Sequence, residues 1–533
     1  MGKQQSLFSE LNVRKVQNAG RFKIKYDKIR KLDLIDKDKI KLIDLNEFRK
    51  RMPTGWFDFM EIVGQQRPIF PQDLRYYQDF STSRFPRGKM VVAVHADIYE
   101  QVKASINQYV MDLAYDGYYA DVYTVKGGRP VHLRNFFKTY VGLKGAVLVG
   151  SVAVPWFEMS DDFDGSSSEF PCDLFYMDLN GTWTDSDLDG KYNLHGVEVN
   201  PEIWVSRLWT PTAGGNDVGL LNDYFARNHQ FRTGQLGHSR TALTLIDDDW
   251  EGFGDCGLDA TIPAANIEVI TAPAATTGDR YKSEVRDVRG WVQIGAHSNP
   301  FGHSFKKPGG GDWVPYTYLR DEHTPKGYFY NLFACSGARY TDPEYMGGWY
   351  IFDREGAERS NGMAAVGSTK TGSMLYFENF YNPMGLGQTV GDAYVSWWKS
   401  IGPDHDLGER QWFYGMTLLG DPTINWWSGV VPRLIQPVNG AVFSHFPRAT
   451  TYQWLPVNIP GATYTLEIDA FGAIAAGRWA AEVGSTFFIR SGIGATSFVH
   501  NFVGAQRGRF RVRATAGGRT FPWSEWSYFR YTV

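Results

Sequence analysis

The stretch KMVVAVHADIYEQVKASINQYVMDLAYDGYYADVYTV, residues 89–125, holds a strand, a helix and a second strand in succession. Its first part, up to Tyr99, is apolar and β-branched, as is typical of a strand leading into a loop. From Glu100 to Gly117 the apolar residues have helical spacing, and the segment ends at a glycine. Residues 118–125 predict the next strand. A strand–helix–strand unit favours a parallel sheet with crossover helices.

The same alternation continues along the chain. A helix is expected near residues 131–140, and KGAVLVGSV then predicts a strand buried on both faces, because its residues are small or β-branched. A further helix is expected over NDVGLLNDYFARNHQFRTG, and a second round of strands opens near residue 241. The pattern predicts an α/β fold with open, mostly parallel sheets flanked by helices in two subdomains. The remaining expected strands are EIWVSRL (202–208), RTALTLIDDDW (240–250), IEVITA (267–272), GWVQIGAHS (290–298), GYFYNLFACSG (327–337) and GMAAVGSTKTGS (362–373).

Length and composition narrow the classes of function. A chain of 533 residues is too long for one core, so two to four domains are expected. A net charge of −3 gives no reason to expect nucleic acid or an acidic membrane as partner. The first residues show no apolar segment of a signal peptide, and no run has the length of a transmembrane helix.

The character of the sequence changes near residue 432. Short alternating strands between turn signals predict an all-β sandwich over residues 432–533. Trp454, Tyr464 and the sequence WSEWS at 523–527 resemble a fibronectin type III or immunoglobulin-like module. We interpret this module as structural, with docking to an assembly partner as the alternative.

Three arginines in the same region recur at every second position and therefore share one face of a strand. We expect their guanidinium groups to stack on two tryptophans. The arginines are Arg509, Arg511 and Arg513, and the tryptophans are Trp523 and Trp526.

Candidate catalytic residues follow three of the expected strands. In open α/β sheets the ligand site lies beyond the carboxyl ends of the strands. Those ends carry an acid within residues 247–249, a base at His297 and a nucleophile at Cys335. A cysteine attacks a carbonyl as thiolate and needs a nearby base, and an acid can orient the imidazole. The acidic candidates are Asp247, Asp248 and Asp249.

The individual residues also have simpler interpretations. A cysteine beside Phe333 and Ala334 is often an inert buried thiol, and a single histidine often serves only as a hydrogen-bonded structural residue. His303, in the loop that follows His297, is a rival for the base.

Four segments in order carry a resemblance to a known family: WVQIGAHSNPFGHSF, YFYNLFACSGARY, MAAVGSTKTGSM and FYGMTLLGDPTINWW. They are similar to the gingipain-type cysteine peptidases, which have a caspase-like α/β fold. The resemblance covers about residues 86–430. It implies a cysteine endopeptidase with Cys335 as nucleophile, His297 as general base or acid, and one acid within residues 247–249 as its partner.

Two positions depart from the family pattern. Ser298 follows the histidine where gingipains have glycine, which affects the oxyanion geometry. The acidic position carries aspartate where glutamate is expected, and its reach to the imidazole is shorter. Ser298, Ser336 and Gly337 are candidate substrate-binding residues at the two strand exits, because backbone amides there could hold an oxyanion.

Gingipains of known preference cut after basic residues through an acid in a pocket. Asp255 and Asp259, in the loop WEGFGDCGLDATI, are the candidates for that acid here, and their alternative interpretation is as solvated loop acids. Cleavage after basic residues is the corresponding expectation.

The sequence TDSDLDGKY predicts a structural Ca²⁺ site. Asp185, Asp187 and Asp189 have the one-three-five carboxylate spacing of a calcium loop, and Lys191 can add its backbone carbonyl. The twelfth position is glycine, so Glu198 or Glu202 would supply the missing bidentate ligand. The alternative is an ordinary acidic turn. The family resemblance also implies calcium, and no organic cofactor is expected.

The sequence predicts four segments: 1–85, an N-terminal extension or pro-segment; 86–240, a first α/β subdomain with the calcium-type loop; 241–431, the catalytic caspase-like subdomain; and 432–533, the β-sandwich. The expected partner is a peptide or protein substrate. The family resemblance suggests export, whereas the visible N-terminus suggests the cytoplasm. The rival hypothesis is a catalytically silent scaffold that binds a peptide or an assembly partner. Whether Cys172 and Cys256 pair is left open.

Overall fold

A computed structural model of the chain describes most of its residues. These are 61–66, 87–163, 165–196, 199–307, 310–354, 359–401, 407–426, 428–437, 439–457, 459 and 461–532. Most of the N-terminal extension and Glu198 therefore lie outside the described residues. The interpretation of the extension as a pro-segment concerns residues that are not described.

The main part of the molecule is built on one sheet of 11 strands, in the order β1-β3-β2-β4-β9-β18-β17-β16-β12-β10-β11. All but two of the neighbouring strand pairs are parallel, the exceptions being β1 with β3 and β17 with β18. The strands of the first group are β1 (Glu61–Gln66), β2 (Gly88–His95), β3 (Tyr118–Lys126), β4 (Leu143–Val149) and β9 (Trp204–Leu208). Those of the second are β10 (Ala242–Ile246), β11 (Ile267–Ile270), β12 (Trp291–Gly295), β16 (Phe329–Phe333), β17 (Ala364–Ser368) and β18 (Met416–Gly420).

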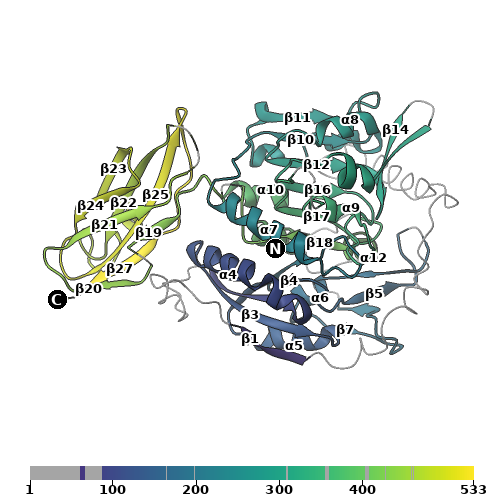
Figure 1. Cartoon of the computed structure of the whole chain (residues 1–533), viewed down its shortest axis with the longest axis horizontal. Coiled ribbons are helices and arrows are strands. Elements are labelled where there is room, and N and C mark those ends of the chain that lie inside the picture. Colours follow the sequence, from purple (N-terminus) through teal and green to yellow (C-terminus); the bar gives the residue numbers. More distant parts are fainter. Residues whose placement is uncertain are drawn as a thin grey trace, which may run out of the picture.

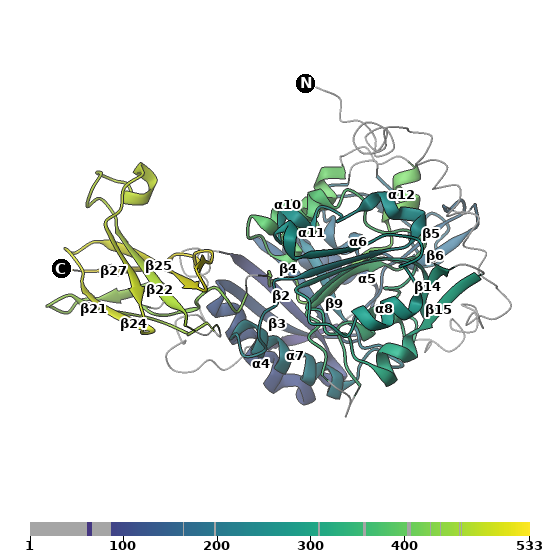
Figure 2. The ribbon, with the colours of Figure 1, turned by 90° about the horizontal axis from the view of Figure 1, so that it is seen from above.

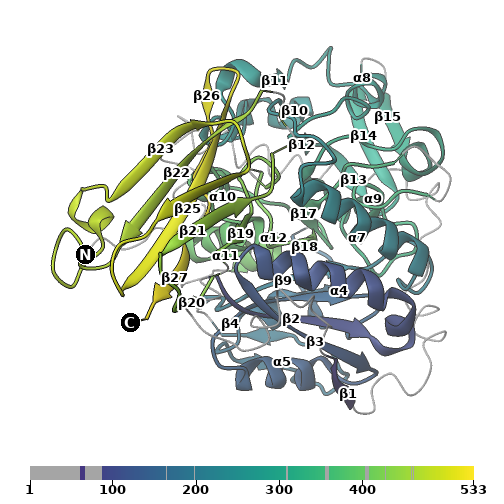
Figure 3. The same cartoon turned by 60° about the vertical axis from the view of Figure 1, so that its left-hand side comes forward.

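Helices cover both faces of this sheet, as Figure 2 shows with the sheet seen nearly edge-on. One face packs against α5, α6, α10, α11 and α12, and the other against α4, α7, α8 and α9. Figure 3 shows α4 and α7 side by side. The helices are α4 (Tyr99–Tyr115), α5 (Pro130–Thr139), α6 (Leu174–Met177), α7 (Val218–Arg232), α8 (Gly278–Glu284), α9 (Met346–Trp349), α10 (Glu378–Gly385), α11 (Val390–Ile401) and α12 (Leu407–Phe413).

Local chemistry explains where several of these helices begin. The side chain of Asp217 accepts a hydrogen bond from the backbone N–H of Leu220 and caps α7, and Thr277 caps α8 in the same way at Arg280. Helix α5 begins at Pro130, a residue without the N–H that the first turn of a helix leaves unbonded. The strands and helices expected from the sequence are present in the α/β region. The expected strand over 240–250 is shorter, because β10 ends at Ile246 and Asp248–Phe253 form a 3-10 helix.

The two groups of strands run in opposite directions, except that β18 of the second group runs parallel to the first group and β1 runs antiparallel to β3. β9 and β18 are parallel, whereas β18 and β17 are antiparallel, so the reversal lies between β18 and β17. The carboxyl ends of β2, β3 and β4 therefore lie at one edge of the sheet, and those of β10, β12 and β16 lie at the opposite edge. The sequence predicts separate sheets in two subdomains, and this prediction is wrong. Instead β18 joins the groups, because it pairs with β17 on one side and with β9 on the other.

The turn after β18 connects helices α4 and α7 to the central sheet. Asp421 is buried and accepts hydrogen bonds from the Tyr109 hydroxyl of α4 and from Asn228 and Arg232 of α7. Its partners span more than 300 residues of chain. This buried network fixes both helices against the sheet, and removal of one charged partner would leave the other uncompensated.

The C-terminal region folds into two β-sheets around a hydrophobic core of its own, seen at the left of Figure 1. One sheet has the order β19-β21-β24 and the other the order β20-β27-β25-β22-β23, with β26 paired to β25. The strands are β19 (Leu434–Gln436), β20 (Ala441–Phe443), β21 (Ala449–Trp454), β22 (Thr463–Ala470), β23 (Phe488–Ile493), β24 (Ser497–Asn501), β25 (Arg507–Ala516), β26 (Arg519–Thr520) and β27 (Ser527–Tyr531). Membership of the fibronectin type III class stays a prediction.

The predicted stacking of arginines on tryptophans along β25 is confirmed. The guanidinium carbon of Arg509 lies 4.2 Å from the ring centre of Trp526, and that of Arg513 lies 4.4 Å from Trp523. Arg511, between them, lies 4.3 Å and 4.6 Å from the two rings. Alternating cations and aromatic rings stabilise this face of the β-sheet.

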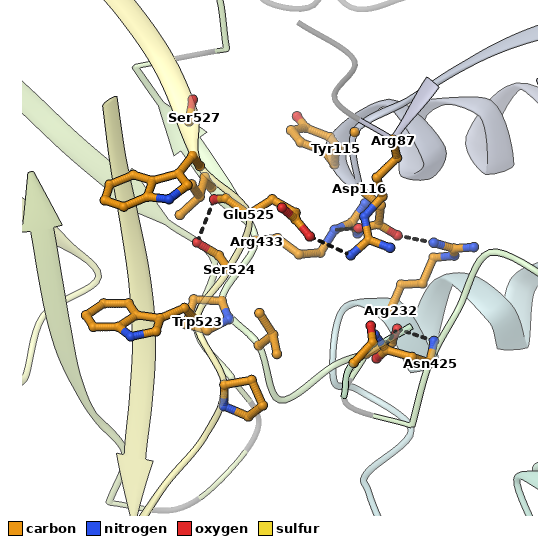
Figure 4. Close-up of a pocket in the computed structure, with 18 of the residues that line it drawn as sticks. Arg87, Tyr115, Asp116, Arg232, Asn425, Arg433, Trp523, Ser524, Glu525 and Ser527 are labelled. Carbon is orange, nitrogen blue, oxygen red and sulfur yellow. Dashed lines mark hydrogen bonds and ion pairs between the residues drawn. The ribbon is translucent and has the colours of Figure 1, made fainter. Parts of the chain in front are cut away.

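The C-terminal region contacts the α/β region around a cavity of about 250 Å³. Figure 4 shows Arg87 reaching Glu525, an ion pair of 3.1 Å between the two regions. Arg433 binds Asp112 at 3.1 Å and Asp116 at 3.2 Å. The charged groups of this cavity thus pair with one another and hold the regions together.

Candidate active site

Strands β10, β12 and β16 are neighbours and end at the same edge of the sheet. Ile246 of β10 aligns with Gly295 of β12, which aligns with Phe333 of β16. Backbone bonds continue past the strand ends: Asp247 N–H donates to Gly295 C=O at 2.8 Å, and Ala296 N–H donates to Phe333 C=O at 3.0 Å. The fold therefore brings the three predicted exits together.

Asp249 is the acid that meets the imidazole of His297. Its Oδ2 lies 2.8 Å from Nε2 of His297, and each side chain is only 6% exposed. The ring of Trp250 lies 4.7 Å from the imidazole centre and shields the pair from one side. A carboxylate that accepts from Nε2–H leaves the lone pair on Nδ1, so Nδ1 is the basic nitrogen in this arrangement.

Cys335 lies at the start of a tight turn and is 8% exposed. The next residue, Ser336, has φ +56°, which is unusual for a residue with a side chain. Its N–H donates to the carbonyl of Lys370 at 2.8 Å, and the N–H of Gly337 donates to Ala334 at 3.3 Å. The amides of Ser336 and Gly337, which are among those predicted to hold an oxyanion, are thus hydrogen-bonded inside the chain. Such a role requires them to exchange partners.

Ser298 and His303 form a buried network beside the site. The Oγ of Ser298 lies 2.6 Å from Nδ1 of His303 and also donates to the carbonyl of Ala296. Nε2 of His303 lies 2.8 Å from the Tyr350 hydroxyl. Burial lowers the pKa of His303 to about 3. Both ring nitrogens of His303 are hydrogen-bonded, so neither is placed to take a proton from Cys335 as the rival base. The hydroxyl of Ser298 belongs to this network.

The loop with the two candidate pocket acids lies against β16, because the ring of Phe253 packs 5.2 Å from that of Phe333. Asp255 is half-buried, and its Oδ1 accepts from the N–H of Gly257 at 3.1 Å. Asp259 is exposed. Both remain candidates for recognition of a basic residue.

The predicted calcium loop is held by backbone amides and by the ammonium group of a lysine, which its sequence spacing did not reveal. Asp185 accepts from the backbone N–H groups of Asp189 and Gly190, at 3.2 Å and 2.9 Å. Lys191 presents its ammonium group, which lies 2.7 Å from Asp189 and also pairs with Glu158 and Glu169.

A different set of carboxylates converges near this loop. One oxygen each from Glu158, Asp187 and Asp189 lie within 4.8 Å of one another. Burial and the two neighbouring aspartates raise the pKa of Glu158. Glu202, a candidate ligand, instead accepts from the backbone N–H of Leu179 at 2.7 Å. The donors fit a hard cation if Glu158 takes the place of Asp185.

The structure also shows residues that the sequence analysis missed. Lys370, after β17, is buried, lies 2.8 Å from Asp162 and supports the cysteine turn with its carbonyl. Trp250, which packs against His297, was also missed. Its position directly after the three aspartates at 247–249 is the sequence feature that could have predicted it. Cys172, Cys256 and Cys335, all in the described part, form no disulfide.

Comparison with known proteins gives distant structural similarity only. No protein-family model and no curated protein sequence matches the chain. The crystal structure of the Arg-specific cysteine proteinase gingipain R (RgpB) is 10% identical, covers 87% of this chain and 100% of its own, and gives a TM-score of 0.48. The complex of Porphyromonas gingivalis RgpB pro- and mature domains is 11% identical, with 83% and 100% covered and a TM-score of 0.49.

Among the described residues, no helix combines the length and apolar character needed to cross a membrane.

Proposed function

We propose that the protein is a cysteine endopeptidase with Cys335 as nucleophile and His297 as general base and acid. The observation that carries the proposal is the shared sheet edge: a cysteine, a histidine and an aspartate follow three adjacent strands, and the histidine is already bound to Asp249 at 2.8 Å. Nucleophile, base and orienting acid are the parts that acyl transfer from a peptide bond needs.

In the first step His297 takes the thiol proton of Cys335 at Nδ1, and the thiolate attacks the carbonyl carbon of the peptide. The imidazolium that forms is stabilised by the carboxylate of Asp249 on its other nitrogen. Collapse of the tetrahedral intermediate breaks the C–N bond, and the imidazolium protonates the leaving amine. A thioester to Cys335 remains.

In the second step the neutral imidazole of His297 takes a proton from water, and the hydroxide adds to the thioester carbonyl. The C–S bond breaks, the acid product leaves, and the thiolate recovers its proton from the imidazolium. Water is the only co-reactant, and Asp249 keeps its charge through the cycle.

We propose cleavage after basic residues, with Asp255 or Asp259 as the recognising acid. The loop that carries them packs against β16 through Phe253. The test compares Asp255→Asn and Asp259→Asn in kcat/KM for peptides with arginine or alanine before the cut. A selective loss for arginine supports the proposal, and equal kcat/KM values for both peptides contradict it.

A catalytically silent scaffold is the second candidate, and burial favours it. Cys335 and His297 are 8% and 5% exposed, so a peptide reaches them only after neighbouring residues move. In this function the peptide or assembly partner would bind without being cleaved, and the C-terminal β-sheets would offer a further surface for docking.

We propose a structural Ca²⁺ held by Glu158, Asp187 and Asp189. A hard cation would neutralise these carboxylates, two of which, Glu158 and Asp189, now share the ammonium group of Lys191. Its role is to stiffen the loop, since calcium does not activate a thiol.

The decisive experiment digests a diverse peptide library with the wild-type protein and with Cys335→Ala, each intact and after removal of the first 85 residues. Cys172→Ala is the matched control, because Cys172 is buried and burial raises the pKa of its thiol. Cleavage by wild type and by the control but not by Cys335→Ala supports a peptidase. Absence of cleavage by both wild-type forms, together with no labelling of Cys335 by a thiol-directed peptidyl ketone, supports the scaffold.

A further inference from the structure

The opposite edge of the large sheet has a topology that favours a second ligand site. After β2 the chain forms β3 on one side of it, and then crosses to form β4 on the other side. In open α/β sheets such a reversal of strand order leaves a crevice at the carboxyl ends of the strands, where ligands bind. Because the two groups of strands run in opposite directions, this crevice is distinct from the Cys335 site. Five strand spacings of about 4.8 Å separate β2 from β16.

A cavity of about 210 Å³ lies at this crevice. It is smaller than the roughly 300–1,000 Å³ of sites for drug-sized molecules, so its ligand must be compact. The residues that line it come from the exits of β2, β3 and β4: His95 and Asp97; Val125, Lys126, Gly127 and Gly128; Ser151, Val152 and Ala153.

The rim of the cavity carries one cation beside one anion. Nζ of Lys126 lies 3.2 Å from Oδ1 of Asp97, and the two side chains are 64% and 61% exposed. An ion pair that is so exposed contributes little stability and opens at small cost. A ligand with its own adjacent carboxylate and ammonium groups can bind both partners at once, whereas a simple anion would meet the repulsion of Asp97.

The interior adds one hydroxyl and an apolar wall. Ser151 accepts a hydrogen bond at Oγ from Asn216 at 2.6 Å, which leaves its O–H to donate to a ligand carboxylate. Val125, Val152 and Ala153 are at most 9% exposed and form the wall. Such a wall accommodates a short aliphatic side chain.

His95 supplies a further polar group. Its Nδ1 is buried without a hydrogen-bond partner. Burial lowers the pKa of this histidine, so the imidazole is neutral and has one donor and one acceptor nitrogen. Gly127 and Gly128, with φ of +62° and +99°, form the adjoining turn and leave the backbone uncovered there.

We propose that this cavity is a binding site for a free α-amino acid with a small aliphatic side chain. Lys126 and Ser151 bind its carboxylate, Asp97 binds its ammonium group, and the apolar wall takes the side chain. The site is independent of the peptidase proposal, since its residues belong to the other edge of the sheet.

The test is isothermal titration of the full chain with L-alanine, L-valine and L-leucine. N-acetyl-valine, which lacks the ammonium charge, and valinamide, which lacks the carboxylate, are the matched ligands. We expect at least one of the free amino acids to bind. Each analogue of valine should bind at least about tenfold more weakly than valine, and Lys126→Ala should weaken binding by at least the same factor, because each loses a charge-assisted hydrogen bond.

Lys103→Ala is the control variant, because Lys103 is also a surface lysine paired with an acid, Glu100, at 3.4 Å. It should bind as wild type does. Ala153→Leu fills the cavity and should abolish binding with unchanged circular dichroism. Absence of binding by all three amino acids overturns the proposal, as does binding that Lys126→Ala and Ala153→Leu leave unchanged. Binding of N-acetyl-valine or valinamide as tight as that of free valine overturns the assignment of a zwitterion.

Discussion

Two histidine–aspartate pairs in this protein have the same length and different surroundings. His195 Nε2 lies 2.8 Å from Asp178, and His297 Nε2 lies 2.8 Å from Asp249. The side chains of the first pair are fully buried. Nδ1 of His195 is bound to the Tyr414 hydroxyl at 2.6 Å, and its ring stacks on a tryptophan. The second pair lies at a strand exit beside the cysteine turn.

The comparison shows that the second nitrogen decides what such a pair can do. A histidine with both nitrogens bound inside a core has no position for a substrate proton, and it acts as a hydrogen-bonded connection. A histidine that is held by an acid at one nitrogen, at a strand exit next to that of a cysteine, has the layout of a general base. Distance alone does not separate these cases.

The largest expected effect distinguishes the two histidines directly. His297→Ala should lower kcat by about 10³-fold or more, because the base is lost, with a small change in melting temperature. His195→Ala should lower the melting temperature instead, since it strands Asp178 in the core at a cost of about 3–5 kcal/mol. Peptide hydrolysis and calorimetry on both variants measure the contrast. Loss of hydrolysis per folded molecule in His195→Ala would break it.

The acids sharpen the same comparison with a slightly smaller effect. Asp249→Asn keeps the shape of the side chain but offers N–H to the imidazole, so it favours the wrong tautomer of His297. We expect kcat to fall by about 10²–10⁴-fold with KM little changed. Asp178→Asn is the matched variant and should leave kcat of the folded protein intact. An unchanged kcat in Asp249→Asn would assign the orienting role elsewhere.

A third histidine extends the comparison to pH. His303 is buried with a pKa of about 3, below the usual value of 6.5. The unfolded chain takes up a proton below pH 6.5 that the folded protein refuses, so stability is lost as pH falls from 6.5 towards 3. The loss should reach about 2 kcal/mol at pH 5. Chemical denaturation at pH 7 and pH 5 measures it. His303→Gln should flatten the dependence, with His445→Gln as the control for removal of an exposed histidine. An equal slope in His303→Gln and wild type would contradict this.

The smallest expected effect concerns the acidic loop, where a lysine rather than a histidine meets several carboxylates. Lys191→Met removes the ammonium group shared by Glu158, Glu169 and Asp189, and should cost about 1–2 kcal/mol in calcium-free buffer. Added calcium should restore more stability to this variant than to wild type. Lys144→Met, which removes an exposed lysine paired with Asp392, is the control. Melting temperatures that calcium leaves unchanged in all three proteins would identify an ordinary acidic turn closed by Lys191.

Much of the α/β architecture follows from local sequence. Helix α4 (Tyr99–Tyr115) and strand β4 (Leu143–Val149) were predictable, because apolar spacing and β-branched composition act over a few residues. The reversal between β17 and β18 was not, since nothing in Met416–Gly420 specifies the direction of its neighbours. Strand partners are chosen by contacts between segments far apart in the chain.

The candidate site divides in the same way. His297 and Cys335 could be proposed because each follows a recognisable strand, and parallel strands carry their exits to one edge. The choice of Asp249 over its two neighbours could not be made, because it depends on the turn after β10 and on the packing of Trp250. The ammonium group of Lys191 was also missed, since its partners Glu158 and Glu169 are far from it in sequence.

The sequence by itself determined the classes of structure and the residue types at the strand exits, because periodicity and turn chemistry are local properties of the chain. The tertiary structure decided which acid meets His297, which histidines are closed inside the core, and at which edge of the sheet the cavity beside His95 lies. Those outcomes depend on burial and on long-range pairing, which arise only when distant segments pack together.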